Sequence, residues 1–177
     1  TTRDILYVEG KTGNNETLHI FVNHWSSRWG GQTESEPRRL YCAVSLRMAV
    51  DRVLNQDPGA KIIIMGDFND EPTNRSIFEM LLSNNKRKNA SGRELYNLMY
   101  DAHNQEGIGS YNYRGNWNML DQIIVSYNLI EQENGLSASY ESGVILKEEW
   151  MLYFSEKYGE SLPGKSGRFF LSLHKGR

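Results

Sequence analysis

The sequence predicts an α/β fold, and three observations carry that prediction. Apolar runs typical of β-strands recur along the chain, at residues 4–10, 17–24, 61–68 and 119–130. Between the second and third runs, residues 36–53 place apolar side chains at helical spacing. The connections are short, and strands that alternate with helices over short connections favour an α/β domain. A hairpin-like turn at 11–16 indicates that the sheet is not purely parallel.

The first helix is expected to begin near Glu36, with Ser35 as its cap and Pro37 in its first turn. The turn sequence of residues 55–59 should end it. The strand at 61–68 is too uniformly apolar to have a solvent-exposed face, so both of its faces should be covered by other elements.

The elements after this strand are less regular. Thr73 or Asn74 is expected to cap a short helix that runs to Leu82. Residues 96–102 fit neither period clearly, and the pattern allows a helix over 148–158.

Composition sets limits on the class of protein. The chain has 177 residues, a net charge of −2 and a single cysteine, Cys42. The charge gives no overall attraction to nucleic acid or anionic membranes, and one cysteine excludes an internal disulfide without fixing the compartment. No segment is long and apolar enough to span a bilayer, and no obligate protein partner is evident.

Oxygen-bearing side chains follow the strand at 61–68, in the sequence GDFND (66–70). Asp67 and Asn69 are two residues apart, so on an extended backbone they point the same way. Such hard oxygen donors suit Mg²⁺, and a carboxylate can orient or deprotonate an attacking water. Taken alone, the motif is equally well explained as a strand-to-helix turn whose polar side chains bond the backbone.

A second polar set ends the strand at 17–24. Asn23 and His24 are followed by Ser27 and Arg28. A histidine here can protonate a leaving oxygen, and an arginine can bind phosphate with its forked donors. By itself this set would be read as a loop histidine and a solvated arginine.

Asp121 is the third candidate, an acid within an apolar strand. A buried carboxylate without a partner is costly, so it should meet a histidine, an arginine or a metal. A structural ion pair is the competing explanation.

Taken together, NHWSSR (23–28), GDFND (66–70) and YRGNWNMLDQIIVS (113–126) resemble the endonuclease/exonuclease/phosphatase superfamily, which has the deoxyribonuclease-like fold. The resemblance covers residues 3–128, and the residues of these motifs are typical of bacterial members.

The resemblance implies a four-layer α/β sandwich of two mixed sheets flanked by helices. It also implies a metal-dependent phosphoesterase that uses Mg²⁺, with Mn²⁺ as an alternative. His24 matches the histidine that assists the leaving group and binds phosphate. Asp67 and Asn69 match the pair that positions the nucleophile and substrate near the metal, and Asp121 matches the acid that orients a catalytic histidine.

Two parts of the family pattern are missing. The asparagine and the metal-binding glutamate of the family's first half do not appear, and no closing Ser-Asp-His motif is recognisable. Leu173 stands where that aspartate would be, and His174 is not assigned as the histidine. Residues 1–177 are therefore expected to form one partial domain, the second half of the fold, which is inactive and prone to associate when isolated. A catalytically inactive binding or scaffold module is the alternative.

The substrate is expected to be a phosphodiester or phosphomonoester, with nucleic acid favoured. Lys86, Arg87, Lys88 and Arg93 could follow a phosphodiester backbone, although a solvated loop explains them better. Tyr111, Tyr113 and Trp117 could stack on a base, or pack along an edge strand.

Overall fold

The computed structural model describes residues 2–88, 92–146, 148–157, 159–163 and 170–173. Its centre is a six-stranded mixed sheet in the order β1-β2-β3-β8-β5-β4. The strands are β1 (Leu6–Lys11), β2 (Thr17–His24), β3 (Lys61–Asp67), β8 (Asp121–Ser126), β5 (Leu95–Asn97) and β4 (Ser83–Asn84). Only β2–β3 and β4–β5 are parallel pairs within this sheet, so the mixed α/β architecture is confirmed.

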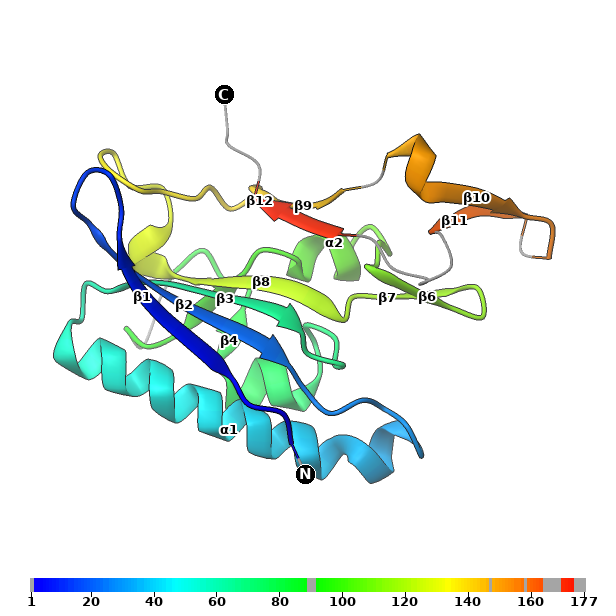
Figure 1. Ribbon diagram of the computed structural model, residues 1–177, viewed down its shortest axis with the longest axis horizontal. Helices are drawn as coiled ribbons and strands as arrows, with labels where there is room; N and C mark the ends of the chain where they lie inside the picture. The colour runs from blue at the N-terminus through cyan, green and yellow to red at the C-terminus, as the bar shows by residue number, and fades with distance from the viewer. Residues whose placement is uncertain (1, 89–91, 147, 158, 164–169, 174–177) are drawn as a thin grey trace.

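Helix α1 (Gln32–Gln56) lies along one face of the sheet (Figure 1). It covers the buried side chains of Ile62 and Ile64 in β3 and of Ile124 in β8. The π-helical turn η1 (Ser76–Met80) and the short helix α2 (Tyr100–Asn104) complete the helical elements before β8.

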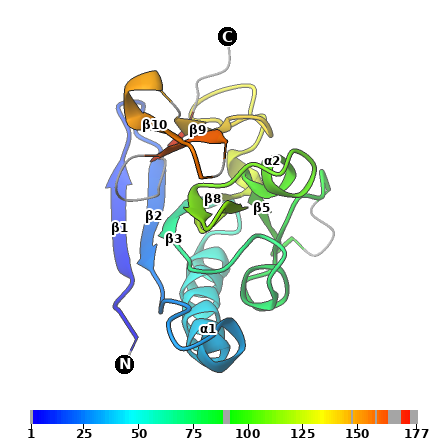
Figure 2. The ribbon, with the colours of Figure 1, turned by 90° about the vertical axis from the view of Figure 1, so that its right-hand side faces the viewer.

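The opposite face carries a second apolar cluster, in which Ile63, Ile123 and Val125 are buried. A small sheet of β9 (Gly143–Leu146) and β12 (Phe170–Leu173) lies over this side, as the end-on view shows (Figure 2). The remaining pairs are β6 (Tyr111–Tyr113) with β7 (Asn116–Asn118), and β10 (Leu152–Ser155) with β11 (Glu160–Pro163). The expectation that β3 is covered on both faces is confirmed.

Some expected boundaries are wrong. Helix α1 begins at Gln32, and its cap is Gly31, whose φ of 122° favours glycine. The Ser35 hydroxyl cannot cap the helix, because it donates back to the Gly31 carbonyl and accepts from Arg39. The structure also shows no helix over 148–157, where the 3₁₀ turn η3 (Glu149–Met151) leads into β10.

The cap expected at Thr73 or Asn74 is also displaced. The helical turn starts at Ser76 with Arg75 before it, and Asn74 Oδ1 instead accepts from the Glu71 N–H. The ambiguous residues 96–102 are divided between β5, α2 and the segment that joins them, and the 3₁₀ turn η2 (Tyr127–Leu129) follows β8. None of the helices in the described ranges could cross a membrane.

Candidate functional site

Three candidate residues form one row across the central strands. His24 pairs with Asp67 in the parallel β2–β3 ladder, and Asp67 pairs with Asp121 in the antiparallel β3–β8 ladder. Asp121 therefore stands at the beginning of β8, where β2 and β3 end. The expected placement at one edge of the sheet is confirmed for His24, Asp67 and Asp121, whereas Asn69 lies in the turn beyond the paired residues.

The row lies on the face of the sheet that carries the second apolar cluster. Paired residues in a sheet share a face, and side chains two residues apart along a strand do so as well. The preceding row on this face is Val22, Met65 and Ile123, all apolar. The apolar face thus changes to a polar row at the strand ends.

The His24 imidazole is within reach of the Asp67 carboxylate. His24 Nε2 lies 3.6 Å from Asp67 Oδ2, and the histidine side chain is 55% exposed whereas that of Asp67 is 7% exposed. A phosphoester could therefore approach the histidine from solvent while the carboxylate stays largely shielded.

The turn after β3 is fixed by its own backbone. Gly66 has a φ of 130°, and a Cβ there would lie 2.0 Å from the Asn23 carbonyl oxygen, so only glycine fits between the strands. The Asn69 N–H donates to Asp67 Oδ1 at 2.9 Å. The Phe68 N–H donates to the Leu120 carbonyl at 2.8 Å, which joins the turn to the start of β8.

Asn69 has a left-handed backbone, with a φ of 51°. Its side-chain amide is buried and donates to the Trp25 carbonyl at 3.1 Å. Because Nδ2 is held in this way, the amide oxygen is the group left to meet a ligand.

Asp121 has a neighbour that the sequence did not predict. Its Oδ2 accepts a hydrogen bond of 2.9 Å from the hydroxyl of Ser110, and the same Ser110 oxygen accepts from the Asp121 N–H at 2.9 Å. The sequence predicted a histidine, an arginine or a metal as the partner of this carboxylate and did not indicate the buried serine hydroxyl. His174 lies outside the described residues.

The three proposed substrate-binding residues are placed differently from one another. Ser27 is exposed in the loop after β2. Asn23 points to the α1 face, away from His24, and its Oδ1 accepts from the Trp25 indole at 3.0 Å. Arg28 is partly buried, which lowers the pKa of its guanidinium, and its donors contact other loops. Their role in substrate binding stays a prediction.

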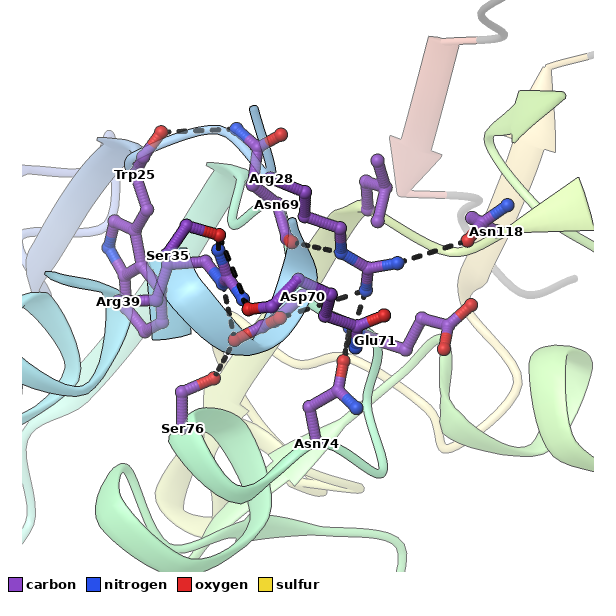
Figure 3. A network of polar contacts seen from close by, with 12 residues as sticks. Trp25, Arg28, Ser35, Arg39, Asn69, Asp70, Glu71, Asn74, Ser76 and Asn118 are labelled. Carbon is purple, nitrogen blue, oxygen red and sulfur yellow. Dashed lines mark hydrogen bonds and ion pairs between the residues drawn. The ribbon is translucent and has the colours of Figure 1, made fainter. Parts of the chain in front are cut away.

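A buried charge network lies beside the turn that holds Asn69, and it was not expected from the sequence (Figure 3). The Asp70 carboxylate accepts from Ser76 at 2.6 Å and pairs with Arg39 Nε at 2.8 Å. Arg39 and Asp70 are 0% and 2% exposed. The available signal was the position of Arg39, four residues before Ala43 on the apolar stripe of α1, where a charge requires a buried partner.

The donor set could hold Mg²⁺ with help from other ligands. Asp67 and Asn69 offer oxygen atoms, and Mg²⁺ is commonly held by one or two carboxylates with water and phosphate completing its shell. In the part of the chain that the structure describes, no cluster of three or more His, Cys, Asp or Glu side chains could bind a metal by itself.

Three of the four basic residues named after β4 are paired with acids, which favours a structural role for those three. Lys86 lies 3.7 Å from Glu94, and Arg87 donates to Glu141 at 2.7 Å. Arg93 pairs with Asp51 on α1 at 3.1 Å. The aromatic residues Tyr111 and Tyr113 stack on each other along the β6–β7 hairpin.

Two solved structures, the beta toxin and SmcL, share this fold at low sequence identity. A mutant of the beta toxin from Staphylococcus aureus, with bound magnesium ions, is 15% identical with a TM-score of 0.51 over 96% of this chain and 57% of that chain. SmcL is 14% identical with a TM-score of 0.50 over 96% and 54%. An endonuclease/exonuclease/phosphatase family protein from Bacteroides thetaiotaomicron is 16% identical, with a TM-score of 0.45 over 91% and 50%.

The chain thus spans about half the length of these solved structures. No curated protein sequence gives a significant match. The model of the Endonuclease/Exonuclease/phosphatase family matches residues 1–171, nearly the whole chain. The chain belongs to the Endonuclease/Exonuclease/phosphatase family.

Proposed function

We propose that the row of His24, Asp67 and Asp121 is the catalytic centre of a metal-dependent phosphoesterase. The observation that carries the proposal is the shared register of these residues across β2, β3 and β8. Residues from three distant parts of the sequence are aligned at one polar edge of this sheet face, and the side chains of His24 and Asp67 lie 3.6 Å apart. Structural ion pairs do not require that arrangement, whereas acid–base chemistry on one phosphate does.

Each residue has a distinct role in this proposal. Asp67 orients the attacking water through its carboxylate, and Asn69 presents its amide oxygen beside it. His24, the most exposed of the three residues in the row, binds a non-bridging phosphate oxygen or protonates the leaving oxygen. Asp121, held by Ser110, orients a catalytic histidine that the family pattern places outside the described residues.

Asp67 and Asn69 would hold Mg²⁺, or Mn²⁺ in its place. The metal would supply charge neutralisation on the phosphate and a more acidic water. The beta toxin, which shares the fold, has bound magnesium ions. The oxygen donors of this chain give an independent reason to propose the same metal.

We further propose that residues 1–177 are one partial domain that is inactive alone and active within the full-length protein. The missing family motifs and the coverage of about half of the solved structures support this. Nucleic acid is the proposed substrate. Arg87 and Arg93 pair with Glu141 and Asp51, so this proposal does not rely on them as phosphate ligands.

The test is hydrolysis of a chromogenic bis-aryl phosphate and of plasmid DNA, with Mg²⁺ or Mn²⁺ and then with EDTA. We expect EDTA-sensitive turnover by the full-length protein and none by the 177-residue chain. Robust turnover by the 177-residue chain would contradict the partial-domain proposal. Absence of turnover by the full-length protein on any phosphoester would favour a binding module.

A further inference from the structure

Arg28 lies where three segments around the candidate site meet (Figure 3). Its Nε donates to the Asn69 carbonyl at 2.7 Å, its Nη1 to Asn118 Oδ1 at 3.2 Å and its Nη2 to Asn74 Oδ1 at 3.1 Å. Asn69 and Asn74 lie in the connection from β3 to η1, Asn118 ends β7, and Arg28 itself belongs to the loop after β2. One planar group therefore joins three loops, which the forked geometry of a guanidinium permits and a lysine ammonium does not.

The guanidinium is itself placed by the buried network. Arg28 Nη2 lies 3.7 Å from Asp70 Oδ1, on the opposite side of the carboxylate from Arg39 and Ser76. Because Asp70 and Arg39 are almost fully buried, the position of this carboxylate is fixed by packing and pairing together. The Asp70 carboxylate thus helps to hold the Arg28 guanidinium in place while the guanidinium donates to Asn69, Asn74 and Asn118.

The residue that this arrangement most directly affects is Asn69. Its left-handed backbone is a conformation that persists only where the surroundings hold it. Arg28 binds its carbonyl, and the Trp25 carbonyl binds its side-chain amide. The direction of the Asn69 amide oxygen, and of the neighbouring Asp67 carboxylate, therefore depends on both contacts.

We propose that Arg28 is a positioning residue that fixes the turn at 67–70 for catalysis, rather than the phosphate ligand that its sequence context suggests. Three of its five N–H groups are used inside the protein, and its side chain is only 20% exposed. The consequence for turnover rests on the proposed function. The consequence for the turn itself does not.

Hydrogen exchange on the full-length protein tests the positioning role without any catalysis. The reporters are the Asn69 N–H, bound to Asp67 Oδ1, and the Glu71 N–H, bound to the same Asn74 oxygen that Arg28 holds. We expect both amides to exchange about tenfold faster, or more, in Arg28→Gln and in Arg28→Lys. The matched control is Arg75→Gln, which removes the same charge from a side chain that is 56% exposed. In this variant both amides should exchange at the parent rate.

Steady-state kinetics of the full-length protein then separate positioning from phosphate binding. A positioning role predicts that kcat falls about 100-fold in both variants, while KM and its salt dependence stay at the parent values. A direct phosphate contact predicts a raised KM that Arg28→Lys largely restores, and this result would overturn the proposal.

Parent-like exchange at Asn69 and Glu71 in either variant would also overturn it, as would equal acceleration in the Arg75→Gln control. Faster exchange in a protein that hydrolyses no phosphoester would retain the positioning role and reject the proposed function, so the two failures are distinguishable.

Discussion

His24 Nε2 lies 3.6 Å from Asp67 Oδ2, across two parallel strands that end together. Forty-three residues separate the two in sequence, and the parallel pairing brings them into register. The loop that follows β2 stays attached to this pair, since the Trp25 N–H donates to the Asp67 carbonyl at 2.9 Å. The contact joins an exposed imidazole to a shielded carboxylate, which is the arrangement on which the proposed chemistry depends.

Replacing the imidazole should affect turnover far more than folding. In the full-length protein, His24→Asn is expected to lower kcat by about 10²–10⁴-fold, because a general acid or phosphate-binding group is lost. The measurement is steady-state hydrolysis together with thermal unfolding. The matched control is His103→Asn, since His103 Nε2 makes a similar 3.6 Å contact with Glu71 outside the row. Equal activity in His24→Asn and the parent would reject the role.

Gly66→Ala should destabilise the protein on the order of 3 kcal/mol, because the backbone conformation is unfavourable for alanine and the new Cβ would collide with the Asn23 carbonyl. Urea unfolding of the variant and the parent measures the change. Gly10→Ala is the control, since a Cβ at that strand position meets nothing within 4 Å. Similar unfolding midpoints for the two variants would show that the β2–β3 contact tolerates a side chain.

Removing the buried cation should also be costly. Arg39→Met is expected to lower the free energy of unfolding by about 3–5 kcal/mol, because Asp70 would keep a buried charge without its closest cation. Arg52→Met, on an exposed position of α1, should change it by no more than about 0.5 kcal/mol. Chemical denaturation of both variants decides the matter, and equal losses would contradict a special role for the buried pair.

The sequence predicted the main strands well because their apolar runs are long and clear. The runs at 17–24 and 61–68 became β2 and β3, and the uniform run of β3 correctly indicated two covered faces. The start of α1 was misplaced because the hydroxyl of Ser35, a good cap in isolation, bonds the Gly31 carbonyl and Arg39, each four residues away. The helix suggested at 148–158 failed because β10 pairs with β11, a contact invisible to local periodicity.

The sequence indicated the three residues of the row but not the residues that hold them in place. His24, Asp67 and Asp121 stood out because polar side chains interrupted or ended apolar strands. Ser110 could not be found, since a serine in a loop has no pattern that points to a carboxylate eleven residues on. The contacts of Arg28 with Asn74 and Asn118 depend on how segments that are distant in sequence pack together, and residue spacing along the chain does not predict that packing.

An acidic residue far from the site gives a prediction for pH. Hydrogen bonds from Lys61, the Leu136 N–H and Asn14 lower the pKa of Glu16 from its ordinary 4.5 to about 2. A carboxyl whose pKa is lowered on folding stabilises the protein above the unfolded pKa and loses that contribution as pH falls toward the folded one. The advantage of the parent over Glu16→Gln should therefore be complete above about pH 4.5 and vanish toward about pH 2.

Urea midpoints measured across this pH range test the Glu16 prediction. Glu133→Gln, an exposed loop position, serves as the control and should show no such closing difference. A constant gap between Glu16→Gln and the parent at every pH would mean that ionisation of Glu16 does not contribute.

The most direct test of the catalytic centre is the turnover of Asp67→Ala in the full-length protein. We expect kcat for phosphodiester hydrolysis to fall at least about 10³-fold while substrate affinity changes little, because Asp67 acts on the attacking water mainly in the transition state. The control is Asp57→Ala, which also removes an aspartate carboxylate but lies before the start of β3, at the end remote from the site. This variant should keep the parent rate. Equal turnover by Asp67→Ala and the parent would show that Asp67 has no catalytic role.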